Sequence, residues 1–376
     1  MKIDSLCVHG TEFAEHTGAV SVPIYQSVTF KHPALGLSTG FDYSRMQNPT
    51  RLALEQTIAT LECGIEGFAY SSGMAAIANV LELFSPGSHI IASTDLYGGI
   101  IRYFRSISEK NGLSFSFVNT GDLMALSNAI KSNTVALFVE TPTNPMMDVT
   151  DIEAASKIAK RHNILLIVDN TFLSPYFQRP LTLGADIVVH SGSKYLAGHN
   201  DTLAGLAVAG DTSICERLRF VYKTVGSCLS PFDSWLVLRG IKTLGLRMSR
   251  QQANAMAIAE FLSTHKRVKK IYYAGLSSHP GYNVMKKQTS GFGSMISFEV
   301  DTADTAINSL SRLRIIAFAE SLGGVESLMT YPTIQTHGDV PETEKNLRGI
   351  NDRLLRLSVG IEDVTDLIDD LNNALQ

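Results

Sequence analysis

The run Ile164–Val168 (ILLIV) is apolar, the run Asp186–His190 (DIVVH) has an apolar centre, and polar residues follow each of them at once. Similar short runs recur along the chain at Gly67–Tyr70, His89–Ala92, Phe115–Val118, Val135–Val139 and Ala204–Val208. Amphipathic stretches such as Ile152–Arg161 separate several of these runs. Strands that are apolar on both faces and alternate with helices are typical of a parallel sheet covered on both sides. We therefore predict an α/β fold with a mostly parallel, seven-stranded sheet.

Two further regions flank this predicted sheet. The first 60 residues are irregular until a helix that we expect to begin near Thr50, a residue type favoured at helix starts. After the sheet, Pro231–His265 is typical of long helices, and the remainder mixes strand and helix patterns at Met295–Val300, Thr302–Leu313, Leu354–Val359 and Val364–Leu375. We expect an N-terminal arm at 1–60 that embraces either its own body or a neighbouring subunit, a large domain at 61–232 that carries the ligand-facing strand ends, and a smaller α+β domain at 233–376.

Composition excludes several classes of protein. The 376 residues carry 32 basic and 36 acidic side chains, and 44% are hydrophobic, which is a globular balance. The net charge of −4 and the lack of a basic run argue against nucleic acid or an anionic membrane as a partner. No apolar stretch approaches the roughly 20 residues that a membrane-spanning helix needs. Because the first residues also lack a secretory pattern, we expect a cytoplasmic protein.

The cysteines and histidines do not indicate a metal site. The four cysteines form no CxxC pair, and the ten histidines form no HxxxH or HExxH pair. The cysteine spacing is too irregular for a disulfide framework, so we expect free thiols and no bound metal.

Lys194 lies just beyond one predicted strand, in the window His190–His199 (HSGSKYLAGH). Ligands of parallel sheets bind beyond the carboxyl ends of the strands, and no carboxylate lies within four positions of this lysine. Partial burial would lower its pKa, as an amine nucleophile requires, although a lone lysine is more often a surface charge. The Ser-x-x-Lys pattern of penicillin-recognising hydrolases also fits, but its SDN and KTG partners are absent.

Three more positions suggest a phosphate-bearing cofactor. Asp169 ends another predicted strand, where it would ligate Mg²⁺, cap a helix or pair with a protonated heterocycle nitrogen. Gly73 and Met74 open a predicted helix, whose first amides suit an anion. Tyr97 follows a further strand and is either a packed aromatic or a ring stacked on a planar cofactor. Lysine and aspartate at strand ends of one sheet suit pyridoxal 5′-phosphate (PLP).

Together these motifs resemble the transsulfuration group of PLP enzymes, which includes cystathionine γ-synthase, the cystathionine lyases and methionine γ-lyase. The resemblance extends from Gly18 to the final helix and implies the aminotransferase-like fold type I. It implies that Lys194 holds the cofactor covalently and that Asp169 pairs with its ring nitrogen. It implies further cofactor contacts from Gly73, Met74, Ser191, Ser193, the stacked Tyr97, and Tyr43 and Arg45 of a neighbouring subunit.

The same resemblance implies where an amino-acid substrate binds. Arg356 would hold the substrate α-carboxylate, and the other expected contacts are Asn144, Ser321, Arg102 and Glu320. Tyr97 and Lys194 would act as acid and base. The expected ligand is thus a small-molecule amino acid. The expected assembly is a homodimer, two of which pair into a tetramer.

Finer features favour one member of the group. Methionine γ-lyases have a cysteine two positions after the stacking tyrosine, where this chain has Gly99. The string 335–339 (QTHGD) departs from the common MTHAS and is closest to Bacillus-type γ-synthases that use O-acetylhomoserine. We therefore expect a cystathionine γ-synthase of methionine biosynthesis that joins O-acyl-L-homoserine, with acetyl as the acyl group, and L-cysteine. The alternatives are a cystathionine γ-lyase or β-lyase, an O-acetylhomoserine sulfhydrylase, and an inactive scaffold with a binding role.

Overall fold

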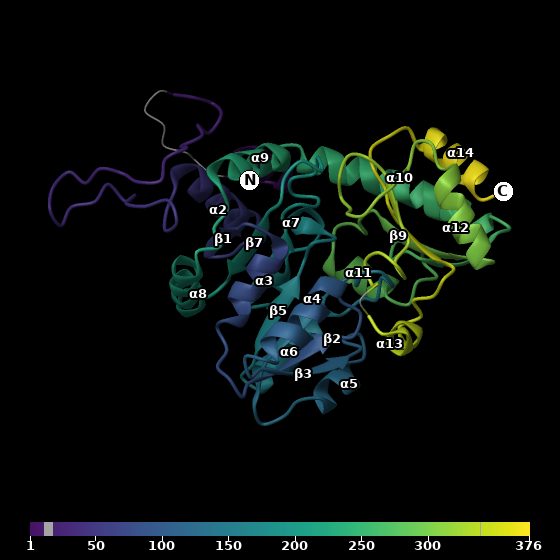
Figure 1. The fold of residues 1–376 in the computed structure, drawn as a ribbon, viewed down its shortest axis with the longest axis horizontal. Coiled ribbons are helices and arrows are strands. Elements are labelled where there is room, and N and C mark those ends of the chain that lie inside the picture. Colours follow the sequence, from purple (N-terminus) through teal and green to yellow (C-terminus); the bar gives the residue numbers. More distant parts are fainter. Residues whose placement is uncertain (11–17, 339) are drawn as a thin grey trace.

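The computed structural model describes residues 1–10, 18–338 and 340–376, and its centre is a seven-stranded sheet (Figure 1). The strand order is β1-β7-β6-β5-β4-β2-β3. The strands are β1 (Glu66–Tyr70), β2 (His89–Ser93), β3 (Ser114–Val118), β4 (Thr134–Glu140), β5 (Leu165–Asp169), β6 (Ile187–Ser191) and β7 (Gly205–Ala209). Strands β2 to β6 pair in parallel, whereas β7 runs antiparallel to both β1 and β6. The predicted mostly parallel sheet of seven strands is confirmed.

Alternate residues of each central strand pack on opposite faces of this sheet. In β4, Phe138 belongs to the apolar cluster on one face, and its neighbour Val139 belongs to the cluster on the other. The covering helices are α2 (Pro49–Glu62), α3 (Gly73–Leu81), α4 (Gly98–Tyr103), α5 (Leu123–Asn128), α6 (Ile152–Arg161), α7 (Ser174–Phe177) and α8 (Thr212–Val225). A π-helix, η1 (Phe104–Ser108), continues α4, and a 3-10 helix, η2 (Pro180–Leu183), follows α7. Burial on both faces explains the continuous apolar runs of the sequence.

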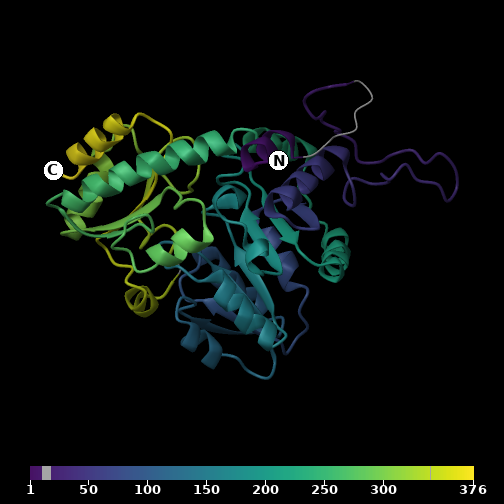
Figure 2. The same cartoon turned by 180° about the vertical axis from the view of Figure 1, so that it is seen from behind.

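A second sheet of five strands lies in the C-terminal part of the chain (Figure 2). Its order is β10-β11-β12-β9-β8, with β8 (Val268–Tyr272), β9 (Met295–Val300), β10 (Ala317–Phe318), β11 (Leu328–Thr330) and β12 (Leu354–Ser358). Its helices are α11 (Tyr282–Gln288), α12 (Ala303–Arg312), α13 (Glu342–Leu347) and α14 (Val364–Ala374). The long α10 (Leu244–Thr264) packs on β8, whereas α9 (Pro231–Ile241) packs on α2. The division of the chain into domains at residues 60 and 232 stays a prediction.

The arm begins with the short helix α1 (Ile3–His9), and residues 18–47 extend away from the rest of the chain (Figure 1). Exposed large apolar side chains stand along this extended segment, among them Val20, Val28, Leu35 and Leu37. Residues 11–17, which belong to the predicted arm, lie outside the described part.

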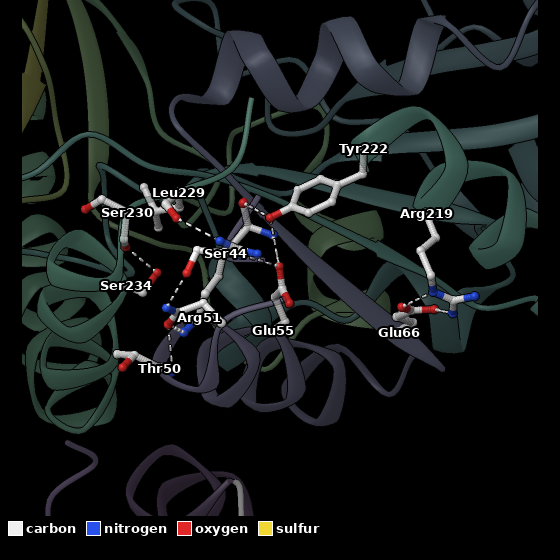
Figure 3. A network of polar contacts seen from close by, with 12 residues as sticks. Ser44, Thr50, Arg51, Glu55, Glu66, Arg219, Tyr222, Leu229, Ser230 and Ser234 are labelled. Carbon is white, nitrogen blue, oxygen red and sulfur yellow. Dashed lines mark hydrogen bonds and ion pairs between the residues drawn. The ribbon is translucent and has the colours of Figure 1, made fainter. Parts of the chain in front are cut away.

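A buried polar network fixes the point where the arm joins the body (Figure 3). The Arg51 Nε atom lies 3.4 Å from Glu55 Oε1, and its guanidinium lies over the Tyr222 ring. The Tyr222 hydroxyl donates to the same Glu55 oxygen, and burial raises the pKa of that carboxyl to about 7. These contacts join α2 to α8. Within the described residues, no helix is both long and apolar enough to cross a membrane.

Candidate active site

A cavity of about 230 Å³ lies between the two sheets, at the carboxyl ends of β4, β5 and β6. The last residues of these three strands, Glu140, Asp169 and Ser191, all line it. Most of the predicted site residues meet there, namely Gly73, Met74, Tyr97, Asn144, Asp169, Ser191, Ser193, Lys194, Glu320, Ser321 and Arg356. The parallel sheet accounts for this convergence, because its strands all end at the same edge.

Lys194 is partly buried, and its Nζ atom donates to Ser321 Oγ at 2.8 Å. Burial and, to a smaller extent, the positive charge of Arg356 lower the pKa of this amine to about 8, and Glu320 partly opposes them. Ser321 has a backbone φ of +92°, which L-residues rarely adopt. Strained backbone of this kind clusters at functional sites. Lys194 therefore loses its proton more readily than an ordinary lysine.

Asp169 is 8% exposed, and its Oδ1 atom accepts two hydrogen bonds from Thr171, from the amide at 3.0 Å and the hydroxyl at 2.5 Å. Burial raises the pKa of this carboxyl, and the Thr171 hydrogen bonds and the nearby His190 ring oppose that rise. The Nε2 atom of His190 in turn donates to Glu62 Oε1 at 2.7 Å. Asp169 is therefore oriented from one side and faces the cavity with the other.

The start of α3 forms the opposite end of the cavity. Ser72 caps this helix through the amide of Ala75, so the amides of Gly73 and Met74 are left without an intrahelical acceptor. A Cβ atom on Gly73 would lie 3.1 Å from the Ser191 Cα atom, which is tighter than ordinary contact. Glycine therefore lets the helix start approach the strand end closely enough for both to bind one anion.

Ser193 stands beside this helix start and is already engaged. Its hydroxyl accepts from the Ala204 amide at 2.9 Å. It also lies 3.3 Å from the Ala204 carbonyl. The amide of Ser191, by contrast, donates to Thr171 Oγ1 at 2.9 Å. Both serine side chains line the cavity.

Arg356, on β12, is 1% exposed and lines the cavity from the side of the second sheet. It donates to Asn144 Oδ1 at 2.9 Å, to the Ser321 carbonyl at 3.0 Å and to Thr330 Oγ1 at 3.1 Å. Its Nε atom has no hydrogen-bond partner, and no carboxylate of the described residues forms an ion pair with it. Burial lowers the pKa of this guanidinium to about 10. A buried cation with an unused donor suits a carboxylate ligand.

Tyr97 precedes α4 and is 41% exposed at the cavity. Its amide donates to Glu140 Oε2 at 3.0 Å. A Cβ atom on Gly99 would lie 2.5 Å from Tyr97 Cε1, so any side chain at position 99 would displace the ring. A Cβ atom on Gly98 would lie 2.3 Å from the Thr336 carbonyl oxygen. The two glycines thus allow close approach both of the Tyr97 ring and of the 331–338 segment.

Three predicted site residues do not line this cavity. Arg102 lies in the last turn of α4 and is exposed. Tyr43 and Arg45 lie in the arm, where the Arg45 guanidinium stacks on the Tyr43 ring and donates to the Lys223 carbonyl. The cavity of the same chain therefore forms without the arm pair.

Sequence reasoning missed Glu140, Thr171 and Thr336, which also line the cavity. Glu140 follows the predicted strand Val135–Val139 directly, so the rule that found Asp169 would have found it too. Thr171 had no signal of its own beyond its place two residues after Asp169. Thr336 belongs to the string 335–339, of which Asp339 lies outside the described residues.

The segment that carries Thr336 is tied to the large sheet's side of the cavity. Arg105 in η1 donates to both carboxylate oxygens of Glu344 at 2.9 Å, and Arg348 donates to the same carboxylate at 3.1 Å. Bidentate pairs of this type fix geometry as well as adding energy. Lys345 of the same helix donates to the Thr333 carbonyl at 3.0 Å, which links the 331–338 segment to α13.

These donors fit PLP. The helix start with Gly73 and Ser191 suits its phosphate, Asp169 suits a protonated ring nitrogen, and Lys194 supplies an amine of lowered pKa. The unused Nε of Arg356 suits the carboxylate of an amino acid. Across the described ranges, no cluster of three or more His, Cys, Asp or Glu side chains is arranged to hold a metal ion.

Comparisons with known proteins agree with this fit. Residues 4–376 match the family model for Cys/Met metabolism PLP-dependent enzymes. Cystathionine gamma-lyase of Bacillus subtilis (strain 168) is 48% identical and covers 100% of both chains, and cystathionine gamma-synthase of Haemophilus influenzae is 49% identical over 99% of this chain and 97% of its own. The crystal structure of cystathionine gamma-lyase from Lactobacillus plantarum complexed with L-serine has a TM-score of 0.97 at 46% identity, over 100% of this chain and 98% of that one. The chain therefore belongs to the Cys/Met metabolism family of PLP-dependent enzymes.

Proposed function

We propose that this protein is a cystathionine γ-synthase of methionine biosynthesis, which replaces the acetoxy group of O-acetyl-L-homoserine with the sulfur of L-cysteine and releases acetate. The observation that carries an amino-acid substrate is Arg356, a buried guanidinium with an unused Nε donor in the same cavity as the Lys194 amine. The γ-synthase of Haemophilus influenzae, at 49% identity, supports this branch of the family. The QTHGD string and Gly99 favour it as well.

The proposed roles follow from the contacts of each side chain. PLP, when bound, supplies an electron sink for the bond that breaks at the substrate Cα. Arg356 orients the substrate by its α-carboxylate, with Asn144 and Ser321 fixing the guanidinium. Lys194 takes and returns protons at Cα, for which a pKa near working pH is suited. Tyr97 stands at the open side of the cavity as a second acid or base.

Other proposed contacts are less central to the chemistry. Gly73, Met74, Ser191 and Ser193 bind the phosphate, and Asp169 pairs with the ring nitrogen. We further propose that Glu320, which lines the cavity, lies near the distal part of the substrate, and that Arg102, which does not line the cavity, contacts the substrate.

We also propose that the catalytic unit is a homodimer, paired again into a tetramer. Tyr43 and Arg45 lie in an arm that extends from the body and do not line the cavity of their own chain (Figure 1). An arginine fork suits phosphate oxygens. A two-fold axis would bring each arm pair to the partner's phosphate end.

A lyase is the second candidate, because the Bacillus subtilis protein that is 48% identical over the whole chain is a cystathionine gamma-lyase. A lyase would use the same cavity, with elimination in place of replacement. A γ-lyase releases 2-oxobutanoate from cystathionine, and a β-lyase releases pyruvate. A sulfhydrylase would instead take sulfide as the acceptor.

The deciding experiment measures these reactions with one enzyme preparation. Cystathionine formation is assayed from O-acetyl-L-homoserine and L-cysteine, and homocysteine formation is assayed from O-acetyl-L-homoserine and sulfide. Release of 2-oxobutanoate and pyruvate is assayed from cystathionine. We expect kcat/KM for synthesis with cysteine to exceed that for either cleavage at least tenfold, with Lys194→Ala as the inactive control. A higher kcat/KM for cleavage would make the protein a lyase, and preference for sulfide would make it a sulfhydrylase.

A further inference from the structure

Glu140 stands next to Asp169 at the edge of the sheet. The two are the last residues of the adjacent strands β4 and β5, and the register pairs their Cα atoms. Glu140 is 5% exposed, and both side chains line the cavity. Two carboxyl groups this close and this buried cannot both carry a charge without a large cost.

The surroundings of the two groups differ. Asp169 accepts two hydrogen bonds from Thr171 and lies near the His190 ring, and both contacts favour its charged form. Glu140 faces the carboxyls of Asp169 and Asp95, which oppose its ionisation.

Two contacts favour the charged form of Glu140, namely the hydrogen bond from the Tyr97 amide and the positive charge of Arg356. Burial outweighs both and raises the pKa of the Glu140 carboxyl well above its ordinary value. Within the described part of the chain, Asp169 accepts two hydrogen bonds and Glu140 accepts one, so the hydrogen bonds favour the charge on Asp169, and we expect the proton of the pair on Glu140.

Glu140 is also linked to a residue at the mouth of the cavity. Its Oε2 atom accepts from the Tyr97 amide at 3.0 Å, and its own amide donates to Ser93 Oγ at 3.3 Å. Tyr97 occupies the cap position of α4, where no side chain of the helix itself caps the first turn. Glu140, on β4, instead accepts from the amide of the cap residue itself.

We propose that Glu140 is a positioning residue of the active site, a neutral carboxylic acid that holds the Tyr97 main chain and leaves Asp169 as the charged carboxyl at the strand ends. The role is independent of the leaving group and of the acceptor thiol, so it goes beyond the proposed function. It uses only the family's PLP chemistry and the contacts of this chain.

Protonation is tested directly by infrared difference spectroscopy of the holoenzyme at pH 8, wild type minus Glu140→Gln. At this pH the Asp95 and Glu55 carboxyls, with pKa values of about 6 and about 7, are mostly ionised, and they cancel in the difference. We expect the band of one protonated carboxyl to disappear in the variant. Asp169→Asn is the matched control and should remove a carboxylate band instead. Loss of a carboxylate band from Glu140→Gln would overturn the proposal.

Positioning through Tyr97 is tested by a double-mutant cycle with Glu140→Ala and Tyr97→Ala. Glu140→Ala should lower kcat about tenfold or more, and the double variant should be no worse than the worse single one. Glu140→Gln keeps an acceptor for the Tyr97 amide and should retain at least a third of kcat. Fully additive losses, or a glutamine variant as impaired as the alanine variant while still folded by circular dichroism, would overturn the role. The infrared measurement needs no substrate, so its outcome does not depend on whether the protein is a γ-synthase.

Discussion

Two substitutions should shift the pKa of the Lys194 amine in opposite directions. Burial lowers this pKa to about 8, Arg356 contributes in the same direction, and Glu320 opposes it. Glu320→Gln should therefore lower the pKa further, whereas Arg356→Gln should raise it. Because burial is the largest cause, the pKa in Arg356→Gln should still lie below the ordinary 10.5 of a lysine.

The size of the effect follows from the fraction of uncharged amine. At pH 7.5 a lysine with a pKa of about 8 is roughly 24% uncharged, against roughly 0.1% for an ordinary lysine, a difference of about two hundredfold. The direction of the pH dependence follows from the amine, which reacts in its uncharged form. Its reactivity should rise with pH, reach half its limit near pH 8 and change little above pH 9.

Competitive acylation measures this midpoint in the cofactor-free enzyme. A trace of acetic anhydride is added at each pH, and the labelling of each lysine is read from peptide masses. Lys110, which is exposed, is the internal control for decay of the reagent in the same sample. A midpoint for Lys194 above pH 9.5 would refute the reasoning, as would a shift of both variants in the same direction.

Three other substitutions test the cofactor contacts and the assembly. Asp169→Asn should lower kcat about a thousandfold, the equivalent of about 4 kcal/mol, and a loss of tenfold or less would contradict its pairing with the ring nitrogen. Replacing Ser191 and Ser193 together by alanine should weaken PLP affinity at least tenfold, because hydrogen bonds to charged groups contribute about 1.5–3 kcal/mol each, and unchanged retention of PLP after dialysis would exclude both. Lys194→Ala and Arg45→Ala should each be nearly inactive alone, yet verified mixed dimers should recover up to roughly half the activity, given two-fold symmetric sites. No recovery would mean that Arg45 serves its own subunit.

The regular elements could be predicted from hydrophobic periodicity because burial is what sets that pattern. The predicted helix Ile152–Arg161 and strand Met295–Val300 coincide with α6 and β9. The short elements could not be predicted, since distant contacts hold them. The helix α13 is short, Glu342–Leu347, and its Glu344 forms an ion pair with Arg105 of η1, which is distant in the sequence.

The start of α2 shows how a local rule fails. We predicted a helix beginning near Thr50 as the cap, whereas the helix is Pro49–Glu62 and its cap is Asn48. The Asn48 side chain accepts from the amides of Thr50 and Arg51. Proline at the first helical position explains the shift, because it has no amide that needs an acceptor.

Some features of the candidate site could also be predicted from the sequence, whereas others depend on contacts between distant residues. Asp169 and Lys194 have a signal in the sequence because each follows a strand of the sheet. The surroundings of Arg356 have none, since Asn144 lies 212 residues away and Ser321 is 35 residues away. The sharing of charge between Glu140 and Asp169 depends on the order of strands in the sheet, which periodicity alone does not determine.

The central claim is that the cavity around Lys194 is the site at which PLP works. Borohydride reduction of the purified yellow holoenzyme, followed by proteolysis and peptide mass analysis, tests it most directly. The claim predicts a phosphopyridoxyl group on the peptide that contains Lys194, and no colour or label in Lys194→Ala. A label on another lysine, or colour in the wild type that resists borohydride, would contradict it.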